Sequence, residues 1–196
     1  MNLNKLYAIH KQIEQIGNKG DRLLEQYRKI VWFGGDHTKI LDIGSGNRDF
    51  RVACAVDKME CQCLDYPFYN AETDNIPFED KYFHVVTLNA VIEHIKDPST
   101  MMSEIKRVLK PNGKLFIRTT NFQQDYKNFY NDPTHVKPYT PLGLQRLLEL
   151  YGFDVIFCEP GLILKSKFWY HVPFKWHIAK MLKGGTRSII IVGKKK

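Results

Sequence analysis

The sequence predicts an α/β fold in which a mostly parallel sheet carries helices on both faces. Short apolar segments rich in β-branched and aromatic residues alternate with segments whose apolar residues recur every three or four positions. The length of 196 residues and the hydrophobic content of 43% are those of an ordinary globular domain. We therefore expect residues 1–196 to form one domain.

Six segments have the composition of strands. They are residues 40–43, 53–56, 82–88, 114–119, 153–157 and 188–192. The first runs into the glycine loop Gly44-Ser45-Gly46, and the second ends at Asp57. The last two strands are separated by about thirty residues that hold an aromatic, basic insert, and they are a candidate for antiparallel pairing.

Helices are expected between these strands. Apolar spacing over residues 3–31 predicts two helices before the first strand. Asp97-Pro98 has the residue types of a helix start, and so does Thr140-Pro141. These two helices should end before Gly113 and Gly152.

Composition argues against several classes of protein. No run of about eighteen uncharged apolar residues occurs, and the first ten residues lack the order of a signal peptide. The four cysteines, of which Cys61 and Cys63 are closest in sequence, have neither zinc-site nor disulfide-scaffold spacing. We expect a cytoplasmic protein with reduced thiols and no metal.

The net charge of +8 is confined to one end of the chain. After Glu159 there are nine Lys or Arg and no acidic residue. The first 159 residues therefore hold 29 − 9 = 20 basic and 21 acidic side chains, a balance of −1. The excess positive charge indicates a local basic surface for an anionic partner.

The glycine loop after the first strand allows backbone to approach a ligand closely. A nicotinamide-binding site would have a third glycine where Asp49 stands and an acid about twenty positions further on. Neither occurs. Asp57, thirteen positions after Gly44, is instead placed to accept hydrogen bonds from a ribose diol.

Five ordered blocks between residues 40 and 117 resemble the class I S-adenosylmethionine-dependent methyltransferases. They are ILDIGSG at 40–46, VD at 56–57, the pair ETDNIPF at 72–78 and YFHVV at 82–86, NAVIEHI at 89–95, and LKPNGKL at 109–115. A late helix at 140–153 is similar too. His84 departs from the family pattern, and the helix after the glycine loop looks truncated or missing.

This resemblance implies a Rossmann-like, seven-stranded, mostly parallel sheet with an antiparallel last strand. It also implies S-adenosylmethionine as the methyl donor. The expected cofactor-binding residues are Asp42 near the ammonium group, Gly44, Ser45 and Gly46 along the methionine, Asp57 with Lys58 at the ribose, Glu72 at the adenine amino group, and Asn89 with Ala90 facing the sulfonium.

Two histidines are candidates for a general base. His94 follows the cofactor strand, and His135 lies in a Pro-rich loop where this family often closes over its acceptor. An imidazole titrates near neutral pH, as such a base requires. The alternatives are that His94 packs under its loop and that His135 belongs to a turn only.

The loop at 132–141 resembles acceptor loops of methyltransferases in glycan and cell-surface biosynthesis. We therefore expect O-methylation of a small molecule or a sugar, with a lipid-linked sugar included. An RNA methyltransferase that uses the basic end of the chain is an alternative, and a non-catalytic cofactor-binding or scaffold protein is another.

Residues 161–187 form an insert in which aromatic residues alternate with Lys and acids are absent. This composition suits an anionic membrane surface, with contact through residues 165–196, and it also suits RNA. A third interpretation is that the aromatic rings cover the edge of the sheet while the lysines stay solvated.

Overall fold

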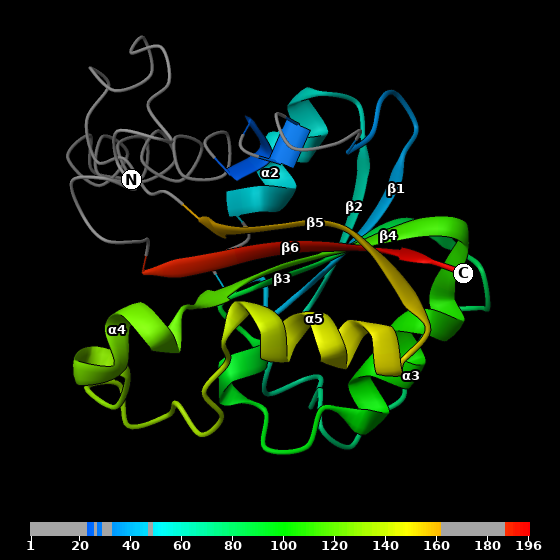
Figure 1. Cartoon of the computed structure of the whole chain (residues 1–196). Coiled ribbons are helices and arrows are strands. Elements are labelled where there is room, and N and C mark those ends of the chain that lie inside the picture. Colours follow the sequence, from blue (N-terminus) through cyan, green and yellow to red (C-terminus); the bar gives the residue numbers. More distant parts are fainter. Residues whose placement is uncertain (1–22, 26, 29–32, 47–48, 162–186) are drawn as a thin grey trace, which may run out of the picture.

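The structure, a computed structural model, describes residues 23–25, 27–28, 33–46, 49–161 and 187–196 (Figure 1). Its strands are β1 (Lys39–Ile43), β2 (Glu60–Leu64), β3 (Phe83–Asn89), β4 (Leu109–Thr120), β5 (Phe153–Gly161) and β6 (Ser188–Lys195). Its helices are α2 (Asp49–Val56), the 3-10 helix η1 (Ile92–His94), α3 (Ser99–Val108), α4 (Phe122–Phe129) and α5 (Pro141–Leu150).

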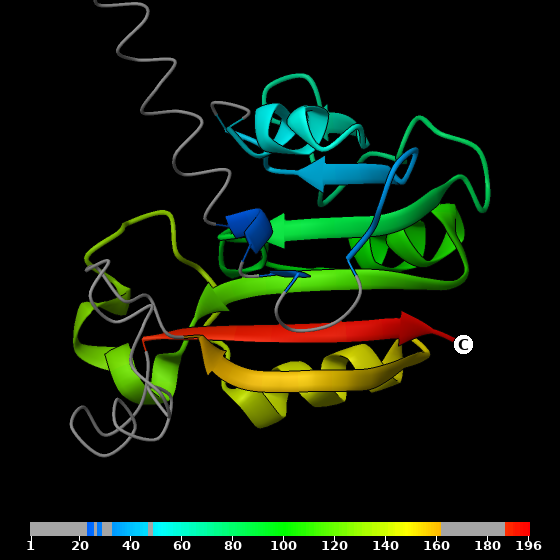
Figure 2. The same cartoon turned by 90° about the horizontal axis from the view of Figure 1, so that it is seen from above.

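The six strands form one sheet in the order β2-β1-β3-β4-β6-β5. Strands β1 to β4 pair in parallel, whereas β6 is antiparallel to both β4 and β5. Figure 2 shows β6 running against its neighbours. The predicted Rossmann-like fold class is confirmed. A seventh strand does not occur among the described residues, because 65–82 cross from β2 to β3 in turns and extended chain.

The predicted strand at 53–56 is wrong, because these residues form the last turn of α2. Ala53 and Cys54 are buried whereas Ala55 and Val56 are exposed, which is the pattern of a helix face. The helix after the glycine loop is therefore present, although it has only eight residues. The second strand of the sheet is β2, in which buried Cys61 alternates with exposed Gln62.

The other predicted elements agree with the structure more closely. Helix α5 begins where Thr140 accepts a hydrogen bond from the Gly143 N–H at 3.0 Å. Helix α3 begins at Ser99, with Pro98 rather than Asp97 as its N-cap. Helix α4 was not predicted from sequence. The two helices expected over 3–31 lie largely outside the described residues, which show helix only at 23–25 and 27–28.

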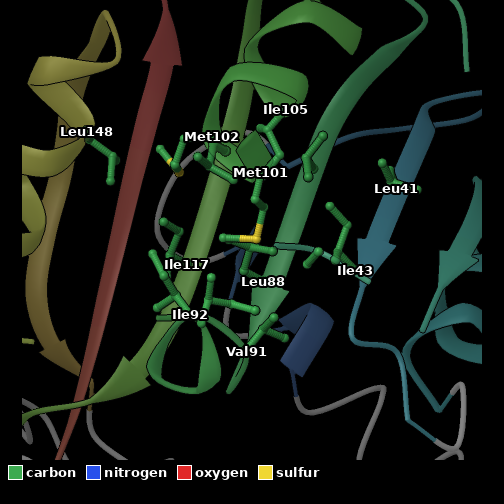
Figure 3. Packing of buried hydrophobic residues seen from close by; sticks show 14 of the residues in the cluster. Leu41, Ile43, Leu88, Val91, Ile92, Met101, Met102, Ile105, Ile117 and Leu148 are labelled. Atoms are coloured by element: carbon green, nitrogen blue, oxygen red, sulfur yellow. The ribbon is translucent and has the colours of Figure 1, made fainter. Parts of the chain in front are cut away.

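Two hydrophobic clusters pack on opposite faces of the sheet. Helices α3 and α5 cover one face, where Met101, Met102 and Leu148 are fully buried (Figure 3). Helix α2 contributes to the other cluster, around Phe116, together with Leu24, Tyr27 and Phe33. Burying one such side chain stabilises the fold by about 2 kcal/mol. The sheet is thus rigid, and the loops at its edges are free to carry the site.

Candidate active site

The carboxyl ends of β1, β2 and β3 meet at one edge of the sheet. The chain leaves β1 to form β2 on one side and later returns to form β3 on the other. This reversal is the topological switch point at which open α/β sheets bind ligands, because the loops diverge there and leave a crevice. The glycine loop follows β1 at this position.

The glycine loop needs residues without a Cβ. Gly44 has a φ of +71°, and a Cβ on it would collide with Cγ2 of Val91. Gly46 has a φ of +50°, and a Cβ there would meet nothing within 4 Å. The first glycine is thus required by packing inside the protein. The second leaves open space beside the backbone, as a bound ligand requires.

Asp65, directly after β2, is the acidic residue of this edge. One carboxylate oxygen accepts a hydrogen bond from the Gly46 N–H at 2.7 Å, and the other accepts from the Tyr66 N–H at 2.9 Å. The Gly44 N–H donates to the Leu64 carbonyl at 2.8 Å. These bonds hold the glycine loop and the end of β2 together. Asp65 is 65 − 44 = 21 positions after Gly44, so the inference from sequence that no acid stands about twenty positions after the glycine loop was wrong.

Asp57 does not lie at this edge, and its predicted position after a strand is wrong. Asp57 and Lys58 follow helix α2 and precede β2, so they lie at the amino end of the strands. A five-residue strand separates the two ends by about 16 Å. Asp57 pairs with Arg28 at 3.0 Å, and Lys58 is 3.9 Å from the Asp36 carboxylate.

Asp42 is buried in β1 beside the glycine loop, with only 4% of its surface exposed. The Thr87 hydroxyl of β3 donates to it at 2.7 Å. Burial raises the pKa of Asp42 to about 7, although the bond from Thr87 opposes the rise. Near neutral pH this carboxyl group therefore changes charge readily, and a nearby cation would favour its ionised form.

Glu72 lies between the cofactor edge and the loop after η1. Its Oε1 accepts hydrogen bonds from the backbone N–H groups of Lys96 and Asp97 at 2.6 and 3.0 Å. Both of these bonds go to Oε1. The contact of Glu72 with adenine remains a prediction. The half-buried carboxylate holds the 96–97 backbone in place.

Asn89 and Ala90 end β3 at the centre of the edge, as predicted. Ala90 has a φ of +56°, and its N–H donates to the Arg118 carbonyl at 2.8 Å. The Asn89 side-chain oxygen accepts from Arg118 at 2.9 Å. Ser45, in the loop beside them, is a hydrogen-bond partner of the Cys63 thiol. All of these residues are close to the switch point.

The structure brings together the two predicted histidines. The rings of His94 and His135 have centroids 4.8 Å apart. His94 Nδ1 lies 2.9 Å from the Thr134 hydroxyl, and His135 Nδ1 lies 2.7 Å from the Phe129 carbonyl. The second contact requires the proton on Nδ1, so Nε2 of a neutral His135 ring is a proton acceptor, and it lies 3.9 Å from the Asp132 carboxylate.

Buried Glu93 completes this cluster. Its carboxylate accepts from the Thr119 hydroxyl at 2.7 Å, and its carbonyl accepts from the N–H groups of Val136 and Lys137. Ligand atoms of Glu93, His94 and His135 lie within 4.8 Å of one another. These three side chains could therefore converge on one metal ion or exchange a proton with a bound molecule.

The four cysteines are free thiols, of which Cys54 and Cys61 are buried. Burial and the neighbouring thiols raise the pKa of Cys61 and of Cys63. These groups are therefore neutral thiols at neutral pH, in agreement with their interpretation as small hydrophobic residues.

Comparison with known proteins decides the family. A family model described as "Methyltransferase domain" matches residues 9–156, which is most of the chain. The chain belongs to the methyltransferase domain family. The chain has the fold of the S-adenosylmethionine-dependent methyltransferases, and its glycine loop after β1 and the acid after β2 lie together at one edge of that fold.

One curated relative is a ubiquinone/menaquinone biosynthesis C-methyltransferase of Ruegeria sp. (strain TM1040). It is 28% identical to this methyltransferase domain over 145 residues, which are 70% of this chain and 51% of the relative. The chain thus spans about half the length of that relative.

Two solved structures have the same fold. A SAM-dependent methyltransferase from Archaeoglobus fulgidus superposes with a TM-score of 0.64 at 22% identity, over 97% of this chain and 99% of that one. A phosphoethanolamine N-methyltransferase 2 from Haemonchus contortus, in complex with S-adenosyl-L-methionine, has a TM-score of 0.61 at 16% identity. The superposition covers 91% of this chain and 52% of the Haemonchus chain.

No helix among the described residues is long and apolar enough to cross a bilayer. The basic aromatic insert at 161–187 lies almost entirely outside the described residues, so the membrane and RNA hypotheses that depend on it stay predictions.

Proposed function

We propose that this methyltransferase transfers a methyl group from S-adenosylmethionine to a small molecule whose reacting atom gives up a proton. The observation that carries the proposal is the position of the His94–His135 pair beside the loop that follows β3. Acidic hydroxyl oxygens and acidic carbon atoms are acceptors of this kind. The first matches the O-methylation expected from the sequence, and the second matches the C-methylation in the Ruegeria relative's name.

The described residues fit the methyl donor. Gly46 leaves room beside its backbone, and its carboxylate partner Asp65 is placed to accept hydrogen bonds from the two ribose hydroxyls. Asp42 lies next to the same loop, where an ammonium group would stabilise its ionised form. Asp65 therefore replaces Asp57 in the ribose role. Neither assignment needs a third glycine, because the donor has no pyrophosphate.

The donor supplies an activated methyl group on a sulfonium, so the protein has mainly to position the acceptor and remove its proton. Asn89 and Ala90 end β3 at the centre of the edge and direct the acceptor to the donor. His135 holds its own Nδ1 proton on the Phe129 carbonyl, and its Nε2 takes the proton from the acceptor. His94 lies against it and limits its rotation.

The acceptor side is lined by exposed aromatic rings. Tyr130 is 61% exposed and packs on Phe129, which packs in turn on His135. Tyr126 of α4 is exposed as well. These rings favour a small acceptor with a flat apolar part over a sugar alone. A lipid-linked sugar remains within this class of acceptors, because its sugar bears the hydroxyl group and its lipid provides the apolar part.

The proposal is tested with the purified chain, isotopically labelled S-adenosylmethionine and a panel of phenols, enols, sugars and an RNA oligonucleotide. Release of S-adenosylhomocysteine with a labelled phenol or enol supports it. Transfer of the labelled methyl group to RNA alone would contradict the proposed class of acceptor. Tight binding of S-adenosylmethionine with no transfer to any acceptor would favour the non-catalytic alternative, and binding of neither adenosyl compound would contradict the cofactor site.

A further inference from the structure

Arg118 and Tyr27 lie on one face of the sheet, next to the site, and the buried donors of their side chains have no part in the function proposed above. We propose that they form a carboxylate-binding subsite for the methyl acceptor, and that the acceptor therefore carries an acidic group. This inference rests on the proposed function and adds the substrate class to it.

Arg118 has a cationic side chain that the described residues do not neutralise. Its Nη1 donates to the Asn89 side-chain oxygen at 2.9 Å, which is a neutral partner. Its Nε is fully buried and has no hydrogen-bond partner in the described part of the chain. Arg118 forms no ion pair there either. A guanidinium with a buried, unpaired donor is costly unless a ligand satisfies it.

Tyr27 presents a second unsatisfied donor. Its ring is completely buried and packs on Phe116 with centroids 4.9 Å apart. Its hydroxyl has no hydrogen-bond partner among the described residues. Phe116 lies two residues before Arg118 on β4, so both point to the same face. Arg118 is close enough to lower the pKa of Tyr27, which burial raises.

The combination of these donors selects a carboxylate. A guanidinium offers parallel N–H groups that match the two oxygens of a carboxylate, and a phenol adds a third donor. Asp42, an acid on the same face, forms no hydrogen bond or ion pair with Arg118 in the described part of the chain, and it accepts a bond from Thr87 instead. Asp42 therefore does not replace an external anion.

The position of Arg118 assigns the anion to the acceptor and not to the methyl donor. The glycine loop and Asp65 follow β1 and β2, whereas Arg118 is on β4, with β3 in between. Asn89, at the end of β3, lies opposite Arg118 in the register. The Arg118 guanidinium reaches the end of β3, where its Nη1 contacts Asn89, the residue that the proposed function places at the acceptor.

The test uses benzoate and benzyl alcohol, which have similar shape and differ in charge. Binding of each to the full chain saturated with S-adenosylhomocysteine is followed by NMR chemical shifts. We expect benzoate to bind about tenfold more tightly than benzyl alcohol, an effect typical of a charge-assisted hydrogen bond. Arg118→Met should abolish this preference, and Tyr27→Phe should weaken it. Arg146→Met, a control at an exposed position of α5, should leave it intact.

Equal binding of the two probes to the wild type would overturn the proposal, and so would a benzoate preference that survives Arg118→Met. Weaker binding of S-adenosylhomocysteine to Arg118→Met would assign the residue to the donor instead. If Arg118→Met fails to fold, Arg118→Lys takes its place. This variant keeps the positive charge but lacks the planar fork, so it should retain only part of the preference for benzoate. Benzoate titration without S-adenosylhomocysteine tests the subsite even where the proposed function fails.

Discussion

The carboxylate of Asp65 accepts a hydrogen bond from the backbone N–H of Gly46 at 2.7 Å. This bond joins the end of β2 to the loop after β1, two segments that are nineteen positions apart in the sequence. It places Asp65, which directly follows β2, against Gly46, the glycine that leaves room for a ligand. The proposed cofactor site is therefore built on adjacent parallel strands, and its geometry depends on their pairing.

The two glycines of the loop should differ in their tolerance to substitution. Gly44→Ala forces a Cβ onto Val91 at a positive φ, so we expect it to lower the free energy of unfolding by about 2–4 kcal/mol. Gly46→Ala meets no neighbour and should cost about 1 kcal/mol through its φ alone. Urea denaturation of both variants measures this. Equal losses would contradict the packing argument.

The charge of Asp42 should make stability depend on pH. The pKa of this carboxyl is raised to about 7 by burial, so the folded protein holds the proton more tightly than the unfolded chain. The associated stability is complete below the ordinary Asp pKa and is lost as pH rises through about 7.

Asp42→Asn removes this titration. We compare the free energy of unfolding of the variant with that of the wild type in the ligand-free proteins. This difference should shift in favour of the variant by at least about 1 kcal/mol between pH 5 and pH 8.5. Thermal unfolding at the two pH values measures the difference. A stability difference that does not change with pH would contradict the assigned pKa shift.

The two histidines should affect catalysis without affecting donor binding. His94→Gln and His135→Gln are each expected to reduce kcat by about 100-fold, because they remove or misplace the general base. The affinity for S-adenosylhomocysteine should not change. His84→Gln is the matched control, since His84 accepts from the Lys39 N–H at the amino end of the strands. Loss of activity in the control would contradict the site.

Much of the fold was predictable from local chemistry. The β-branched and aromatic run at 82–88 and the Thr140-Pro141 helix start were both correct, because each pattern has one stable interpretation. The segment 53–56 was not, because four small apolar residues fit a strand or the buried turn of a short helix equally well. The alternation of Cys61 and Gln62, followed by Asp65, was the signal that could have placed β2.

The site was predictable only as far as it lies in single loops. Gly44, Asn89 and Ala90 lie at the carboxyl edge of the sheet, as the sequence predicts, whereas Asp57 lies at the opposite edge because the second strand was misplaced. The proximity of Tyr27 and Arg118 depends on packing between distant segments. No sequence spacing encodes that contact.

The most direct test of the cofactor site is calorimetric titration of the wild type, Asp65→Ala and Asp57→Ala with S-adenosylhomocysteine. The wild type should bind, and Asp65→Ala should lose about 2 kcal/mol of binding free energy with its charge-assisted hydrogen bonds. Asp57→Ala should bind like the wild type. Unchanged affinity in Asp65→Ala, with a loss in Asp57→Ala, would contradict the placement of the donor at the carboxyl ends of β1 and β2.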